Sequence, residues 1–293
     1  MIKCWIWICS FASVLSLHGQ SKTVPAAAAV SAVATTDFIR FVEKDEGDSL
    51  QTAVVEYVND RGISVDLIGA VHIADRRYFE ALNARFKTYE AVLYELVGRP
   101  VEQRQTLKPG DGSDKLRWLG VMQEKMRQLL KLDSQLQCID YKAPNFIHAD
   151  LSMEGFFASQ EEKKETFLNL WMKAALAKAA TSDGQQPASD MSLIMTLLMS
   201  QDSATDLKRL IGKEFDRVEQ LMAGIEAGDG TAIIGARNQH ALQILQKQIA
   251  VGRKRLGIFY GAAHFPDMEQ RLMQMGFKKR RIEWLKAWDI DAE

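Results

Sequence analysis

The chain has 293 residues, of which 47% are hydrophobic and 26% charged, a composition typical of globular proteins rather than disordered or fibrous ones. Its 37 Lys and Arg residues almost balance its 38 Asp and Glu residues, which argues against a dedicated nucleic-acid-binding protein. Three cysteines cannot build a disulfide framework. Cys138 is the only cysteine beyond the N-terminal segment, and we expect it to be a small core residue.

The N-terminal segment is typical of an export signal. One basic residue, Lys3, precedes the apolar run 4–17, which is short for a spanning helix but suits a signal peptide. We therefore expect a signal peptide over residues 1–21, a low-complexity linker over 22–36, and a periplasmic or secreted mature protein. The alternative is an uncleaved N-terminal anchor, which would attach the protein to a membrane.

Residues 37–293 are expected to form a single domain, whose first part alternates strands and helices. The β-branched runs 52–58 and 64–73 flank the turn sequence Asn-Asp-Arg-Gly and predict a hairpin. A helix at 78–86 followed by a buried strand at 91–97 predicts a βαβ unit with parallel strands. After these we expect a loop at 108–114, a helix at 115–131 and a short strand at 136–141.

The middle of the chain is helical by pattern, and the α/β pattern returns afterwards. Apolar residues recur at helical spacing from 152 to about 227, which predicts an inserted, mostly helical cap. The remaining predicted elements are a helix at 232–250, a strand at 255–264, a helix at 265–277 and a strand at 280–290. The expected fold class is α/β (α+β), with a mixed central sheet built from the N- and C-terminal segments.

No common catalytic signature occurs, but a short pattern is present twice. Gly69 to His72 and Gly261 to His264 each read Gly-x-x-His, end a predicted strand and precede an amphipathic helix. Ligands of open α/β sheets bind beyond the carboxyl ends of the parallel strands. We therefore expect two related halves that face each other and bring both imidazoles to one point, with the glycines allowing close approach.

Glu95 ends the third predicted buried strand. A buried carboxylate is costly unless it is paired or bound to a metal, and two histidines with one glutamate form a known catalytic metal set. The sequence therefore suggests His72, Glu95 and His264 as ligands of a divalent ion. The alternatives are histidines that form only structural hydrogen bonds, and a Glu95 that caps a helix or pairs with Arg99.

Two further histidines lie in the predicted domain. His148 precedes a predicted helix and stands two residues before Asp150, so the two could form a His–carboxylate pair. Asp150 could instead be the N-cap of that helix. His240 lies in the helix predicted at 232–250, and we expect it to be solvated.

Four segments together resemble the TraB/GumN/TIKI family. They read LIGAVHIADRRYFEAL (67–82), YEAVLYELVGRP (89–100), ARNQHALQIL (236–245) and LGIFYGAAHFPDMEQRLMQMGF (256–277). That family is defined by paired GxxH motifs, an acidic residue after the strand that follows the first motif, and an Arg-Asn or Arg-Asp pair before the second. The resemblance covers residues 50–100 and 230–290, and the helical middle only loosely.

The resemblance implies a metal-dependent peptidase. TIKI members cleave a secreted signalling protein, other members are tied to the shutdown of peptide pheromones, and many have no known activity. By position, His72 and His264 would be metal ligands or catalytic imidazoles and Glu95 the essential acid. Arg237 and Asn238 would line the same pocket.

The sequence departs from the family pattern at two places. Ala70 replaces a Thr after the first motif glycine, and Phe265-Pro266 stands where a Leu-containing turn is usual. Neither change removes a proposed metal ligand, but the resemblance does not identify the substrate of this protein.

Two functions are open on the sequence. The first is an exported hydrolase that uses Mn, Co or Zn on a peptide or protein substrate, with Glu95 as ligand or general base and Arg237 steadying the oxyanion. The second is a non-catalytic exported protein that holds a small ligand or metal through the same imidazoles. Neither implies a nucleic-acid partner, and membrane contact is expected only through an uncleaved leader.

Overall fold

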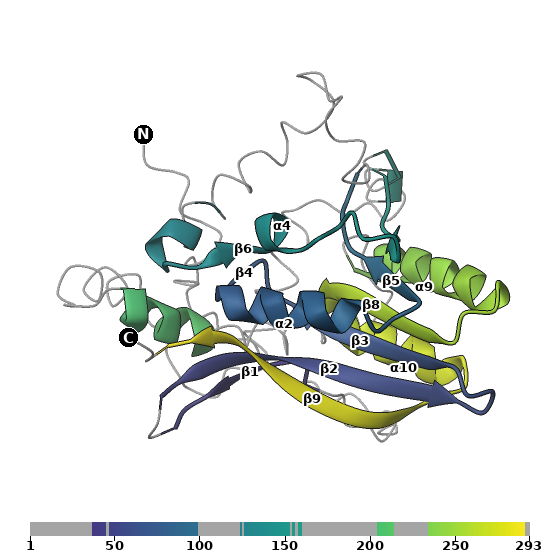
Figure 1. The fold of residues 1–293 in the computed structure, drawn as a ribbon, viewed down its shortest axis with the longest axis horizontal. Helices are drawn as coiled ribbons and strands as arrows, with labels where there is room; N and C mark the ends of the chain where they lie inside the picture. Colours follow the sequence, from purple (N-terminus) through teal and green to yellow (C-terminus); the bar gives the residue numbers. More distant parts are fainter. Residues whose placement is uncertain are drawn as a thin grey trace, which may run out of the picture.

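The computed structural model describes residues 37–44, 47–98, 124, 126–152, 154–155, 158–159, 204–213 and 234–290 (Figure 1). Within them, seven strands form one mixed sheet in the order β1-β2-β3-β8-β5-β7, with β9 also paired to β2. The expected fold class is confirmed. The strands are β1 (Ile39–Val42), β2 (Ser49–Asn59), β3 (Ser64–Ala70), β5 (Ala91–Tyr94), β7 (Phe146–His148), β8 (Arg255–Gly261) and β9 (Phe277–Asp289).

One half of the sheet is antiparallel and begins with the predicted hairpin, which is confirmed as β2 paired to β3. Its turn is closed by Asn59, whose side-chain oxygen accepts hydrogen bonds from the backbone N–H groups of Arg61 and Ile63, both at 3.0 Å. Gly62 completes the turn with a positive φ of 72°, which favours glycine. Strand β9 pairs with β2 along its whole length, so β1 and β3 share the other edge of β2.

The other half of the sheet is parallel. β3 pairs with β8, β8 with β5, and β5 with β7, all in the parallel sense. The two strands of the predicted βαβ unit, β3 and β5, are therefore not neighbours, because the C-terminal strand β8 lies between them. This insertion aligns four carboxyl ends at one edge of the sheet, where ligands of α/β proteins bind.

Helices cover both faces of the sheet (Figure 1). Tyr78 of α2 (Arg76–Phe86) bonds Thr52 of β2 at 3.0 Å, whereas Glu269 of α10 (Phe265–Gln274) accepts a hydrogen bond from Tyr57 of β2 at 2.8 Å. Because side chains five positions apart on a strand point to opposite faces, α2 and α10 lie on opposite sides. Helix α9 (Gly235–Ala250) lies beside α10 and packs near β5.

The predicted strand at 136–141 is wrong. Residues 135–138 form the short helix α4 (Gln135–Cys138). Ile139 and Tyr141, the apolar residues at alternate positions in the predicted strand, are buried in the bend and turn that follow this helix. The strand beside β5 is instead β7, which was not predicted because it has only three residues and follows Pro144 closely. A further two-stranded ladder joins β4 (Ile73–Ala74) to β6 (Asp133–Ser134).

Several strands end before their predicted limits. β3 ends at Ala70 and β5 at Tyr94, so His72 and Glu95 lie just beyond the strands rather than in them. β8 ends at Gly261, and His264 lies in the short 3-10 helix η2 (Ala262–His264). The candidate site residues therefore lie just beyond the ends of the strands, at the edge of the sheet.

Several predictions fall outside the described residues. These are the signal peptide and linker (1–36), the loop at 108–114, and most of the ranges 115–131 and 152–227. Within the range predicted to be an inserted cap, residues 204–213 are described and are helical. They pack against β1, since a Cβ on Gly212 would lie 2.7 Å from the Phe41 ring. No helix in the described part of the chain is both long and apolar enough to cross a bilayer.

Candidate functional site

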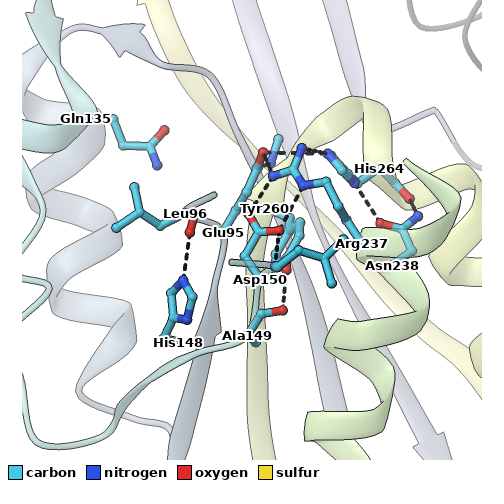
Figure 2. Close-up of polar contacts among 12 residues, drawn as sticks. Glu95, Leu96, Gln135, His148, Ala149, Asp150, Arg237, Asn238, Tyr260 and His264 are labelled. Carbon is cyan, nitrogen blue, oxygen red and sulfur yellow. Dashed lines mark hydrogen bonds and ion pairs between the residues drawn. The ribbon is translucent and has the colours of Figure 1, made fainter. Parts of the chain in front are cut away.

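The segments that follow the four parallel strands place polar side chains at their carboxyl ends. His72 follows β3 by two residues, Glu95 follows β5 by one, Asp150 follows β7 by two and His264 follows β8 by three. The first turn of α9 adds Arg237. Figure 2 shows Arg237 between Glu95, Asp150 and His264, so segments that are far apart in the sequence meet at this edge of the sheet.

Arg237 is the centre of the cluster. Its Nε and Nη2 donate to the two oxygens of Asp150 at 2.9 and 2.6 Å, and Nη2 also donates to Glu95 Oε1 at 2.6 Å. The side chains of Arg237 and Asp150 are 8% and 0% exposed. Burial opposes the charge on the guanidinium, but Glu95 and Asp150 outweigh it and raise the pKa of Arg237. The guanidinium therefore faces carboxylates rather than solvent.

Both carboxylate oxygens of Glu95 are held by donors. Oε1 accepts from Arg237, and Oε2 accepts from the backbone N–H of Gly261 at 2.6 Å. Burial alone would raise the pKa of Glu95, but the charges of Arg237 and His264 prevail and hold it well below its usual value. The partner of Glu95 is thus Arg237, whereas the alternative partner, Arg99, lies outside the described residues.

Gly261 makes room for this approach, because a Cβ there would lie 3.3 Å from Glu95 Oε2, a tight contact. Gly69 of the first motif has a different role. A Cβ at Gly69 would lie 3.0 Å from the Ala53 carbonyl oxygen and 3.3 Å from that of Phe38, so this glycine lets β3 pack closely against neighbouring backbone. The two motif glycines therefore serve the site and the sheet respectively.

The His264 ring is oriented by Asn238. The Asn238 amide Nδ2 donates to the His264 carbonyl at 2.9 Å and to Asp267 at 2.8 Å, so its Oδ1 is an acceptor and takes the Nδ1–H of His264 at 2.6 Å. In the neutral ring the lone pair is then on Nε2. That atom faces Arg237 Nη1 at 3.3 Å and Glu95 Oε1 at 3.6 Å. Histidines that bind metals or act as bases are commonly fixed in this way.

His72 stands at the edge of the cluster. Its side chain is exposed, and its electrostatic effect on the lowered pKa of Glu95 comes after the larger effects of burial, Arg237 and His264. In the described part of the chain, the hydrogen bonds and ion pairs of Glu95 and His264 do not include His72. Among the described residues, the two motif histidines thus share one end of the sheet with no hydrogen bond between them.

His148 and Asp150 do not form the expected pair. His148 lies on β7 rather than just before a helix, and its Nε2 donates to the Leu96 carbonyl at 2.7 Å. Asp150 is bound instead by Arg237. The Ser152 hydroxyl oxygen accepts a hydrogen bond from the backbone N–H of Gly155, at the start of the helical residues that follow. Ser152 therefore makes the capping contact there, and Asp150 does not.

His240 was expected to be solvated, but it is half-buried. Burial lowers its pKa, against the opposing effect of Asp150. Tyr260 was not predicted as a site residue. It donates to the Ala149 carbonyl at 2.6 Å, and its ring lies 5.2 Å from that of His264. Only its place inside the strand of the second GxxH motif could have indicated it.

Part of the expected metal set has suitable geometry. Among the described residues, no group of three or more His, Cys, Asp or Glu side chains is arranged to hold a metal ion. However, His264 Nε2 and Glu95 Oε1 are 3.6 Å apart. Two ligands with bonds of about 2.1 Å to one tetrahedral zinc ion lie about 3.4 Å apart, so the separation of these two atoms suits one divalent ion. Both atoms also face the Arg237 guanidinium, which an ion bound here would have to displace.

Comparisons with known proteins found no matching family model, no matching curated protein and no matching solved structure. The geometry and chemistry of the site are therefore the basis for assigning a function.

Proposed function

We propose that the protein is an exported metal-dependent hydrolase of the TraB/GumN/TIKI type that acts on peptide bonds. The observation that carries this proposal is the pairing of His264 Nε2 with Glu95 Oε1 at 3.6 Å, at the carboxyl ends of adjacent parallel strands. With His72 as the third ligand, these side chains would hold a Mn, Co or Zn ion. Such an ion polarises a carbonyl and lowers the pKa of a bound water.

Glu95 is suited to be an anionic ligand of the ion. Its pKa is held low, so it is ionised at neutral pH as a metal ligand must be, and the donors Arg237 and Gly261 fix the position of both oxygens. Arg237 supports this role rather than the oxyanion role expected from the sequence, because its guanidinium contacts Glu95 and Asp150.

His264 supplies the imidazole ligand. Asn238 holds the Nδ1–H, which leaves the Nε2 lone pair directed into the cluster, where it would bind the ion. Asp150 takes no proton in this scheme, since both of its oxygens hold Arg237 in place.

Turnover of peptides tests the proposal. Full-length protein, stripped with a chelator, is incubated with a library of blocked peptides, and the products are measured by mass spectrometry. We expect cleavage only after Mn²⁺, Co²⁺ or Zn²⁺ is restored. His264→Ala should abolish cleavage and keep the circular dichroism spectrum, while His240→Ala, its control on α9, should remain active. Cleavage that survives His264→Ala, or that no metal promotes, would contradict the proposal.

A non-catalytic binding protein is the alternative, and one observation favours it. Arg237 already contacts both Glu95 and His264, so a guanidinium occupies the centre of the cluster and offsets one of its two carboxylate charges without an added ion. Metal binding measured by calorimetry, together with no cleavage of the library under any metal, would favour this alternative.

A further inference from the structure

The Arg237 guanidinium contacts the same two atoms that the proposed metal ion would need. Its Nη1 lies 3.3 Å from Nε2 of His264, and its Nη2 donates to Oε1 of Glu95 at 2.6 Å. Because Asn238 holds the Nδ1–H of His264, the neutral ring has a single lone pair left, on Nε2. One lone pair accepts either an N–H or a metal ion, and in this structure it faces the guanidinium.

Charge also prevents the ion and the guanidinium from being bound together. A divalent ion bound to His264 and Glu95 would lie directly beside the positive charge of Arg237. The side chains of Arg237 and Glu95 are only 8% and 15% exposed, so little water is present to screen the repulsion. Arginine stays protonated in proteins, so loss of a proton cannot relieve this repulsion. The ion and the guanidinium are therefore alternative occupants of one position.

Asp150 can hold the guanidinium when the ion is bound. Nε and Nη2 of Arg237 donate to the two oxygens of Asp150 at 2.9 and 2.6 Å, and the Asp150 side chain is 0% exposed (Figure 2). This two-point contact does not involve Nη1, the nitrogen that faces His264. The contact with Asp150 can thus persist while the contacts with Glu95 and His264 are exchanged for an ion.

We propose that Arg237 is an internal competitor for the metal ion and limits the affinity of the site. In the free protein it offsets the charge of Glu95 and faces the lone pair of His264, so the cluster is stable without an ion. Ion binding replaces these two contacts and keeps the pairing of Arg237 with Asp150. The backbone N–H of Gly261, 2.6 Å from Oε2 of Glu95, continues to hold that carboxylate. This inference rests on the metal site of the proposed hydrolase and adds how its affinity is set.

Calorimetry of Zn²⁺ binding to the metal-stripped, full-length protein tests the competition. Arg237→Leu/Asp150→Asn removes one positive and one negative charge, so the net charge of the cluster is unchanged, and leucine brings no ligand atom. We expect this double variant to bind Zn²⁺ about 10- to 100-fold more tightly than the wild type, the value of one charge-assisted hydrogen bond. Lys278→Leu/Asp60→Asn is the matched control, since it removes an exposed ion pair of 3.1 Å and should bind Zn²⁺ like the wild type.

A measurement on the wild type does not depend on the folding of the double variant. In ¹⁵N NMR, Zn²⁺ should shift the Nε2 signal of His264 and the guanidinium Nη signals of Arg237 over the same titration, because one event changes both. A shift of the His264 signal with unchanged Arg237 signals would mean that the ion and the guanidinium are bound together, and would overturn the competition.

Peptide cleavage separates this inference from the proposed function. Tighter Zn²⁺ binding by the Arg237→Leu/Asp150→Asn variant, with no cleavage by the wild type under any metal, would support the competition and contradict the hydrolase. Equal or weaker binding by this variant, with metal-dependent cleavage by the wild type, would overturn the competition and leave the hydrolase standing. An equal gain in the Lys278→Leu/Asp60→Asn control would also overturn it, because the gain would not come from Arg237. No Zn²⁺ binding by the wild type or the double variant would overturn both.

Discussion

Removing the charge of Arg237 should destabilise the protein strongly, and by an amount that depends on pH. Arg237→Met keeps most of the side-chain volume but leaves the carboxylates of Glu95 and Asp150 without their shared counter-charge. The Asp150 side chain is 0% exposed and that of Glu95 15%, so water cannot replace the guanidinium. Breaking a buried ion pair from one side typically costs about 3–5 kcal/mol.

The pH dependence follows from Glu95. In the wild type its pKa is depressed, so its contribution to the free energy of unfolding is complete above about 4.3, the unfolded value, and is lost as pH falls through the folded pKa. In Arg237→Met the main charge that lowers this pKa is gone, and burial raises it instead. At acidic pH, protonation of Glu95 then removes its unpaired buried charge and reduces the destabilisation of the variant. The difference between the two proteins should therefore be largest near pH 7 and shrink below about pH 4–5.

Thermal and denaturant unfolding at pH 7 and pH 4 provides the assay. A loss of about 3–5 kcal/mol corresponds to a fall in Tm of roughly 6–20 °C for a domain of this size. Arg280→Met is the control, since Arg280 is 68% exposed and lies 3.6 Å from Glu56, a surface pair worth at most about 1 kcal/mol. Adding Asp150→Asn to Arg237→Met should restore part of the loss. A loss below about 1 kcal/mol, or one equal at both pH values, would refute the reasoning.

Two further substitutions probe the ring of His264 and the packing of the sheet. Asn238→Leu should cost about 1–3 kcal/mol of stability, and ¹⁵N NMR should show that the His264 ring no longer holds its proton on Nδ1 alone; an unchanged ring spectrum would contradict the assigned hydrogen bond. Gly69→Ala should cost about 1–3 kcal/mol because its Cβ would lie 3.0 Å from the Ala53 carbonyl oxygen, as measured by urea unfolding. Wild-type stability in Gly69→Ala would mean that this close approach is not tight.

The site was only partly predictable from the sequence. Glu95 and His264 could be predicted because each follows a run of buried apolar residues, and a polar residue at the end of such a run faces the carboxyl edge of the sheet. Asp150 was proposed for a different reason, as a partner of His148. Its true partner, Arg237, lies 87 residues away, and no local pattern relates the two.

Local sequence patterns were enough to predict the hairpin, the helices that follow each GxxH motif and the α/β fold class. Strand alternation, turn residues and helical spacing depend on neighbours in the chain, so they can be inferred from a single sequence. The three-residue strand β7 was missed because so short a segment has no measurable period. The helix α4 was mistaken for a strand because two buried residues at alternate positions also occur in turns.

Only the tertiary structure decided which strand ends meet. Placing β8 between β3 and β5 brings Gly261 to Glu95, and α9 then delivers Arg237 to a carboxylate 142 residues away. The sequence by itself determined which residues stand at the ends of strands, because burial and turn chemistry act between near neighbours. The order of the strands, and with it the contacts of each buried charge, depends on how distant apolar faces pack together, which no stretch of the chain specifies alone.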